Sequence, residues 1–341
     1  MSLEILEVDP RDDAAFAEWH AVYDAADREG RVDPVTWDLR SLRTMFLQDS
    51  GTEQRRGFVG RADGRAVVVG DLRLPLVDNR HRAQIVVFAR PDARRRGYGG
   101  AMLAHLERLA VDLGRTTMGA EAVWPYDGGP EGHGEPGAEF ARRHGYDLVL
   151  ADVRRRLSLP LPDDLLDRLE KEAAPSWSTG PSAYTLRSFR RPVPDDIVEG
   201  WARLEAAVET EAPVGGLDIE PATPDVGAVR HIEALFAEQG RSSWGTVALD
   251  AMGDAVAYTE LVMGRHERVA YQWGTLVQRR HRGHRLGLAL KIANLRLLVQ
   301  DRPDATAVNT YNAESNDHMI AVNEALGFVP VERMGEFQKR L

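Results

Sequence analysis

Two short runs rich in arginine and glycine decide how this sequence is interpreted, and each is expected between a strand and a helix. They are Arg94-Arg95-Arg96-Gly97-Tyr98-Gly99-Gly100 and Arg282-Gly283-His284-Arg285-Leu286-Gly287. A helix N-terminus presents unpartnered backbone N–H groups and about half a positive charge. Glycine lets a ligand approach that backbone, and arginine adds charge, so each run predicts a diphosphate-binding loop. For either run alone, a glycine turn with solvated arginines is the alternative interpretation.

Neither run matches the other common phosphate-binding motifs. The triphosphate loop G-x-x-x-x-G-K-[ST] occurs in neither of them. In the first run, Gly97 and Gly99 are followed by Met102 where the dinucleotide fingerprint has its third glycine. The motifs therefore disfavour a nucleotide triphosphatase and a Rossmann cofactor.

The two runs belong to an internal repeat that extends over most of the chain. The matching pairs keep their order and are displaced by 182 or 188 positions: Pro10/Pro192, Asp13/Asp195, Trp19/Trp201, Arg94/Arg282, Gly99/Gly287, Ala101/Ala289, Arg108/Arg296 and Gly145/Gly327. An ordered repeat of this kind predicts two homologous lobes. Prolines and glycines mark the seam, and leucines at helical spacing predict a short helix within it. We therefore expect an N-terminal lobe at 1–159, a linker at 160–182 and a C-terminal lobe at 183–341.

Each lobe is expected to contain the same order of elements. The predicted strands lie at 3–8, 66–72 and 85–89 in the first lobe and at 184–188, 246–249, 256–263 and 270–277 in the second. After each arginine-glycine run, apolar periodicity predicts a helix, at 100–113 and at 288–299. Strands mixed with helices indicate an α/β (α+β) fold in which helices cover a sheet.

The composition disfavours several classes of protein. With 341 residues, 43% of them hydrophobic, the chain can form about two cored domains. It has no cysteine, which excludes disulfides, a thiolate nucleophile and cysteine-based metal sites. The net charge of −10 disfavours a nucleic-acid partner. No apolar stretch is long enough to span a bilayer and the start lacks a signal-peptide pattern, so we expect a cytoplasmic protein without membrane contact.

A metal site is not expected either. His281 and His284 have a spacing of three, which can place two histidines on one face. Arginines flank both of them, and their positive charge opposes a divalent cation. No third ligand is evident in the sequence.

Together with residues downstream, the two runs resemble those of the GNAT N-acetyltransferases. That family's acyl-CoA loop follows V-x-P-x-x-[RQ]-x-x-G-x-[GA]; the first lobe offers 89–94 followed by Gly97 and Gly99, and the second offers 277–282 with Arg285 in place of a glycine. The family's later signature, N-x-x-[AM]-x-x-x-Y-E-x-L-G-F, is matched in the second lobe by Asn316, Met319, Asn323, Glu324, Leu326, Gly327 and Phe328. The resemblance covers both lobes and implies two tandem GNAT-like lobes, each a mixed, mostly antiparallel sheet flanked by helices.

The two lobes depart from the family pattern in different places. The first keeps its loop, but Gly134 and Ala141 stand where the later signature has asparagine and tyrosine. The second keeps Asn316, but Asn323 replaces the tyrosine that often acts as general acid in the family. On these grounds the sequence favours the C-terminal lobe as the catalytic one.

The resemblance implies that acetyl-CoA donates an acetyl group to a small amine, which attacks the thioester directly, without a metal. It places pantetheine and the thioester along the main chain at Leu276 and Val277 and the diphosphate at the loop. The expected donor-binding residues are Leu276, Val277, Arg282, Gly283, His284, Arg285, Leu286, Gly287, Asn312 and Asn316 in the second lobe and Arg94, Arg95, Arg96, Gly97, Tyr98, Gly99 and Gly100 in the first.

Glu260 and Tyr311 are the expected catalytic residues. Glu260 is the candidate base because, in such folds, its strand faces the acceptor pocket; an outward-facing sheet carboxylate is the alternative, and Glu314 and Glu220 are weaker candidates. Tyr311, beside a strand end, is the candidate acid, with water or an ordinary strand tyrosine as alternatives.

Two other functions are compatible with the same residues. One is a non-catalytic protein that binds or senses acyl-CoA or another ligand with degenerate GNAT lobes. The other is a protein-lysine or N-terminal acetyltransferase. For each of these functions, the acetyltransferase included, we expect a monomer or homodimer.

Overall fold

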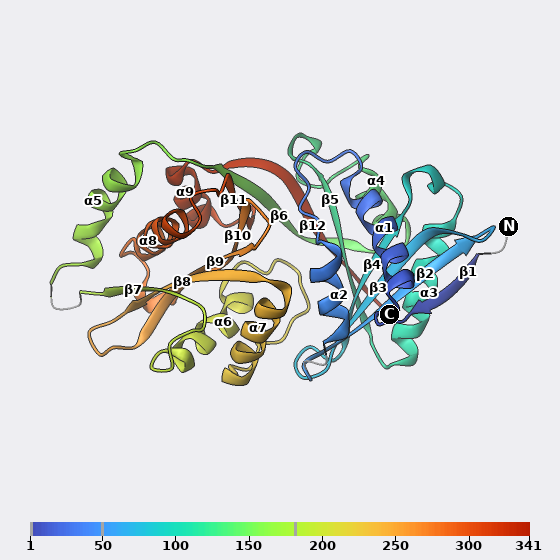
Figure 1. Ribbon diagram of the computed structural model, residues 1–341, viewed down its shortest axis with the longest axis horizontal. Helices are drawn as coiled ribbons and strands as arrows, with labels where there is room; N and C mark the ends of the chain where they lie inside the picture. Colours follow the sequence, from blue (N-terminus) through green and yellow to red (C-terminus); the bar gives the residue numbers. More distant parts are fainter. Residues whose placement is uncertain (1–2, 49–50, 181–182) are drawn as a thin grey trace. The chain divides into compact units, whose positions relative to one another are not determined.

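The contacts within the chain divide it into two compact units (Figure 1). The computed structural model describes residues 3–48, 51–180 and 183–341. Unit 1 takes in the chain up to Ala151 together with Gly215–Glu220 and Arg333–Leu341, and unit 2 contains Asp152–Val214 and Pro221–Glu332. These units differ from the predicted halves because two strands belong to both of them. The strand Asp147–Ser158 passes into unit 2 at Asp152, and the strand Val329–Arg340 passes into unit 1 at Arg333. The predicted linker ends at 181 and 182, which lie outside the described residues.

Most elements fall within one unit. Unit 1 holds β1 (Glu4–Val8), α1 (Asp13–Arg28), α2 (Leu39–Leu47), β2 (Glu53–Ala62), β3 (Arg65–Pro75), β4 (Arg82–Ala89), α3 (Tyr98–Asp112), β5 (Thr117–Pro125) and α4 (Pro136–Arg143). Unit 2 holds α5 (Leu165–Trp177), β7 (Thr185–Arg190), α6 (Val198–Glu211), α7 (Val226–Gln239), β8 (Arg241–Leu249), β9 (Ala255–Gly264), β10 (Val269–Val277), α8 (Leu286–Asp301), β11 (Ala307–Ala313) and α9 (Asp317–Leu326). Two strands change unit along their length: β6 (Asp147–Ser158) at Asp152 and β12 (Val329–Arg340) at Arg333.

Each unit contains a mixed sheet in which the described pairings are mostly antiparallel. The order is β1-β2-β3-β4-β5-β12 in unit 1 and β6-β11-β10-β9-β8-β7 in unit 2. The described parallel pairs are β4–β5 and β10–β11, and each joins strands on either side of a crossover helix, α3 or α8. This arrangement confirms the predicted fold class, two tandem lobes with helices flanking mixed sheets.

Helices cover both faces of each sheet. In unit 1, Met102 and Leu106 of α3 pack on one face against Gly70, where a Cβ atom would come within 2.8 Å of Leu106. Aromatic side chains of α1 and α2, among them Trp19 and Phe46, pack on the other face. In unit 2, α8 lies on one side of the strands and α6 and α7 on the other (Figure 1). Among the described residues, every helix is too short or too polar to cross a membrane.

The helix predicted within the linker forms as α5 and packs on α8. Leu169 and Ala173 of α5 are buried. Arg296 of α8 donates hydrogen bonds of 2.6 Å to both Glu170 and Asp167 of α5. The helix is therefore a fixed part of unit 2.

A lysine lies in the core of unit 2. Lys291 of α8 is 2% exposed, and its Nζ donates a 2.7 Å hydrogen bond to Oδ1 of Asn323 on α9. Burial lowers the pKa of this amine to about 7, because the charged form loses its hydration. The unfolded chain therefore binds the proton more tightly than the folded one.

Lys291→Met should flatten the rise of stability with pH. Because the pKa is depressed on folding, the wild-type free energy of unfolding should increase between pH 7 and 9.5, by at most about 1.4 kcal/mol per pH unit from this residue. Urea denaturation of wild type and variant across that window measures the difference. Lys171→Met, which removes an exposed lysine of α5, is the control. An unchanged slope in Lys291→Met would contradict this account.

Candidate functional site

The parallel ladder in unit 1 stops after three residue pairs. Arg82–Gln84 of β4 pair with Thr117–Gly119 of β5, whereas β4 continues to Ala89 and β5 to Pro125. Beyond Gln84, the edge of β4 that faces β5 carries backbone groups with no described ladder partner. Unpaired strand groups readily bind an extended ligand that has its own amides.

The ladder in unit 2 opens in the same way. Val269–Gln272 of β10 pair with Ala307–Thr310 of β11, and β10 then continues to Val277. The predicted donor residues Leu276 and Val277 lie in this unpaired part and still pair with β9 on their other side. In addition, β10 has an extra residue at Trp273 relative to β9, a bulge that the equivalent strand of unit 1 lacks.

Both arginine-glycine loops adopt one backbone shape with their residues exchanged. In unit 1, Arg95 and Gly97 have left-handed φ angles of 63° and 86°; in unit 2, Gly283 and Arg285 have 86° and 54°. Glycine and arginine have therefore swapped the two left-handed positions. Such alternation turns successive N–H groups toward one point, which suits an anion. Among the described residues, the N–H groups of Gly97 and Gly99 have no backbone acceptor.

The first arginine of each loop is tied to the end of the preceding strand. Arg94 donates from Nε to the carbonyl of Ala89 (3.3 Å), and Arg282 donates from Nε to the carbonyl of Val277 (3.0 Å). Their Nη2 atoms bind the carbonyl of Ala26 and the carboxylate of Glu211. Both arginines thus fix the loop on its strand, a contribution that sequence reasoning assigned to ligand charge.

The surroundings of the two loops differ. In unit 2, His284 Nδ1 lies 3.1 Å from the carbonyl of Ser176, and Arg285 Nη1 donates to the carbonyl of Glu172 at the end of α5. Gly287 is buried there. In unit 1, the side chains of Arg95 and Arg96 and the residue Gly97 are exposed, and Tyr98 begins α3. Gly99 and Gly100 are half-buried beside Phe140 of α4 and His144, which follows that helix.

The two asparagines predicted to bind the donor in unit 2 are held by protein groups. Asn316 caps α9 by accepting from the N–H of Met319. Asn312 accepts from Arg155 at 3.0 Å and from Asn323 at 3.1 Å. Because Asn323 also accepts from Lys291, a buried polar chain occupies the position of the family tyrosine.

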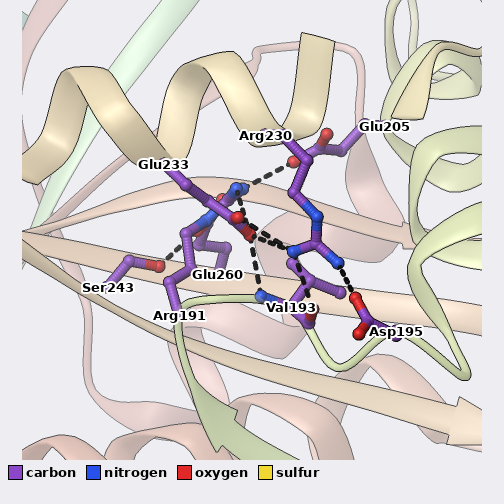
Figure 2. A network of polar contacts seen from close by, with 8 residues as sticks. All are labelled: Arg191, Val193, Asp195, Glu205, Arg230, Glu233, Ser243 and Glu260. Carbon is purple, nitrogen blue, oxygen red and sulfur yellow. Dashed lines mark hydrogen bonds and ion pairs between the residues drawn. The ribbon is translucent and has the colours of Figure 1, made fainter. Parts of the chain in front are cut away.

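Glu260 is a buried member of an ionic network that centres on Arg191 (Figure 2). The carboxylate is 2% exposed and accepts from Arg191 Nε (2.5 Å) and Nη2 (3.0 Å) and from the Ser243 hydroxyl. Arg191 also contacts Glu205 and Glu233. Burial lowers the pKa of Arg191, but Glu260 more than offsets this and raises it above its ordinary value. These contacts favour a structural carboxylate, and the role of Glu260 as a base stays a prediction.

The other candidate residues are dispersed. Tyr311 is half-buried on β11, one residue beyond the last pair with β10, and Glu260 lies on β9 with β10 in between. Glu220 belongs to unit 1, where it accepts from the N–H of Asn79 at 2.9 Å. Glu314 follows β11 directly. Within 3–48, 51–180 and 183–341, no group of three or more acidic or histidine side chains is arranged to hold a metal ion.

Sequence reasoning missed a row of polar side chains on the sheet of unit 1. Arg73 of β3 pairs in register with Gln84 of β4, the last residue of the parallel ladder. Gln84 Nε2 donates to Oε1 of Glu121 on β5 at 3.2 Å, and Arg73 Nη2 lies 3.6 Å from the same oxygen. The absence of a side chain at Gly119 makes room for Gln84, because a Cβ there would lie 2.1 Å from its Oε1.

The row lies on the face that α1 and α2 cover in part. Next to Arg73 on this face, Asp71 is buried and accepts from Arg55 Nε at 2.9 Å, and Arg55 stacks over Phe46 of α2. In the strand registers, Asp71 pairs with Gly57 and Val86, as Glu260 pairs with Gly245 and Gly274. Asp71 is thus the counterpart of Glu260, and an arginine neutralises each. The side chains of Arg73 and Glu121, by contrast, are 29% and 37% exposed.

Comparisons with known proteins agree with this geometry. The sequence model of the Acetyltransferase (GNAT) family matches residues 19–124, within unit 1. A solved tandem GNAT protein from the clavulanic acid biosynthesis pathway is 28% identical, with 99% of this chain and 98% of that chain covered and a TM-score of 0.78. A GCN5-related N-acetyltransferase from Sphaerobacter thermophilus is 18% identical, with 99% and 95% covered and a TM-score of 0.65. Residues 19–124 thus match the GNAT family model, and the whole chain is similar to a tandem GNAT protein, in agreement with the resemblance of its motifs.

A curated relative is more limited in extent. The mycothiol acetyltransferase of Geodermatophilus obscurus is 29% identical over 216 residues, which make up 62% of this chain and 59% of that protein. The match therefore spans less than two thirds of the relative's length.

Glu260→Gln should destabilise unit 2. Neutralising one partner leaves the buried Arg191 with less compensation, which typically costs about 3–5 kcal/mol. Thermal and urea unfolding measure the loss, and Glu324→Gln, at an exposed position on α9, serves as control. A variant that unfolds like wild type but has lost turnover would instead assign Glu260 to the chemistry.

Proposed function

We propose that the protein is an N-acetyltransferase that moves the acetyl group of acetyl-CoA to a small amine, and that unit 1 holds the donor. One observation carries the proposal: in unit 1 the free edge of β4 leads directly into an exposed loop with two left-handed residues at the start of α3. GNAT proteins use acetyl-CoA, and the name of the curated relative supports a small-molecule acceptor.

The elements of unit 1 suit the two ends of such a donor. The N–H groups at Gly97 and Gly99 and the helix N-terminus would hold the diphosphate. The unpaired backbone of β4 between Ile85 and Ala89 would bind the pantetheine amides as an added strand does. One of its N–H groups would then stabilise the thioester oxygen as negative charge develops.

Unit 2 offers a loop of the same backbone shape, but more of its residues are held by protein groups. Its loop is bonded to α5, its glycine at 287 is buried, and a polar chain from Lys291 to Arg155 fills the region of the family tyrosine. These contacts favour unit 1 over the C-terminal lobe that the sequence motifs favour.

The transfer itself needs one base. The neutral amine attacks the thioester carbon, the new C–N bond forms, the C–S bond breaks and the thiolate of CoA leaves. Glu121 is placed to take the proton that the amine loses, because its carboxylate is partly exposed and lies two residues beyond the last β4–β5 pair. The proton then returns to the thiolate through water.

Gly99→Glu should abolish acetyl-CoA binding, whereas Gly287→Glu should leave it intact. A carboxylate at Gly99 places a negative charge at the diphosphate position, and we expect a loss of at least 100-fold in affinity. Isothermal calorimetry gives affinity and stoichiometry, with one site per chain expected for wild type. Gly99→Ala and Gly287→Ala, with melting temperatures for all four, control for misfolding. Loss of binding in the Gly287 variants alone would move the donor to unit 2.

Glu121→Gln should lower kcat by about 100- to 10,000-fold, the usual contribution of a positioned base, with little change in acetyl-CoA affinity. Release of the CoA thiol in the presence of an amine measures the rate. Glu4→Gln, on the edge strand of the same sheet, is the matched control. An unaffected rate would exclude Glu121 as the base.

A further inference from the structure

Arg73 carries a guanidinium that the protein leaves largely unsatisfied. Its Nε is buried, and among the described residues it has no hydrogen-bond partner. Its contact to Glu121, at 3.6 Å, is longer than a hydrogen bond. A half-buried guanidinium normally forms several hydrogen bonds, so this one is open to an acceptor group supplied from outside.

The fold itself does not require these charges. In unit 2 the same register positions hold Val262 on β9, Tyr271 on β10 and Tyr311 on β11, since Val262 pairs with Tyr271 as Arg73 does with Gln84. The β10–β11 and β4–β5 pairs likewise place Tyr311 opposite the position of Glu121. One lobe therefore has uncharged residues at these three positions, whereas the other places a cation, an amide and an anion there.

The row formed by Arg73, Gln84 and Glu121 lies away from the loop that is proposed to bind the diphosphate. Gln84 lies five residues before Ala89, the end of β4, which corresponds to about 17 Å along a strand. Arg73 is in register with Gln84. It therefore lies where the β4–β5 pairing ends, and not at the arginine-glycine loop. A group bound there would face the acyl end of the donor.

The surrounding charges define what the row can bind. Burial lowers the pKa of Arg73, but Glu121, Asp71, Glu53 and Glu336 more than offset this and raise it, so four carboxylates act on this guanidinium. Such a field attracts an ammonium group, whereas the planar N–H groups of Arg73 match a carboxylate. The 3.6 Å between Arg73 and Glu121 requires these two ligand groups to be close together.

We propose that the acceptor is a small amino acid, whose carboxylate binds Arg73 while its amine faces Glu121. Amine and carboxylate are then separated by only one to three carbons. This inference rests on the proposed function, because it names the acceptor class of the same site. Arg73 is a specificity-determining residue in this scheme, and Glu121 handles the amine proton.

Matched pairs of acceptors test the proposal, because each pair differs only in the carboxylate. The probes are leucine against isopentylamine, serine against ethanolamine, and ornithine against putrescine, with thiol release measured at saturating acetyl-CoA. We expect kcat/KM to favour the amino acid by about 10- to 100-fold, the effect of charge-assisted hydrogen bonds.

Variants then assign the preference to Arg73. Arg73→Gln should remove the preference for the amino acid, mainly through a higher KM. Arg73→Lys should keep only part of this preference because the bidentate geometry is lost. Acetyl-CoA affinity should be unchanged in both. Arg56→Gln, whose guanidinium already pairs with Glu7 on β1, is the matched control and should behave as wild type.

Two kinds of failure are distinguishable. Turnover of both members of each pair at equal rates would overturn the amino-acid assignment and leave the acetyltransferase proposal standing. Without turnover of any amine, calorimetric binding of the same probes to the CoA-saturated protein still decides: leucine binding that Arg73→Gln abolishes supports the recognition site, and equal or no binding of leucine and isopentylamine refutes it.

Discussion

The short parallel ladder between β4 and β5 is the constraint on which the rest of the candidate site depends. A crossover through α3 forces these strands to run in parallel, yet only three pairs form before they part. Parting leaves backbone donors and acceptors of β4 without a described ladder partner, which is costly unless water or a ligand binds them. The same crossover places the α3 N-terminus at the end of β4. The free edge of β4 and the N-terminus of α3 are thus placed by the same crossover connection.

The duplicated lobes separate what this backbone needs from what a ligand needs. Both keep two left-handed positions in the loop although glycine and arginine have exchanged places, and both keep an arginine bonded to the strand end. These shared features maintain the shape of the loop. Around it, unit 2 has α5 and the Lys291 chain, whereas unit 1 has partly exposed polar residues on its sheet. Differences between the lobes are therefore the better guide to function.

Much of the fold could be predicted from the sequence because local patterns carry it. Apolar runs and the repeat locate β3, β4, β9 and β10 and the helices after each loop, and leucine spacing locates α5. The strand β2 has no such signal: its first residues are Glu53, Gln54, Arg55 and Arg56, and it is fixed by pairing with β1 and β3. The strand exchange at Asp152 and Arg333 depends on partners in the other half of the chain, which no local pattern reveals.

The candidate site was predicted less completely than the fold, and Glu260 shows why. A glutamate within an apolar strand signals a buried carboxylate, but its partner Arg191 lies 69 positions away and is joined to it only by folding. Once Asp71 is seen at the same register position with its own arginine, the carboxylate becomes a repeated feature of the scaffold. Glu121 also stands within an apolar run, at 117–125, but its own side chain is exposed. Its significance comes from Arg73 and Gln84, which three adjacent strands bring into one row, and from the Val262, Tyr271 and Tyr311 that replace this row in the other lobe.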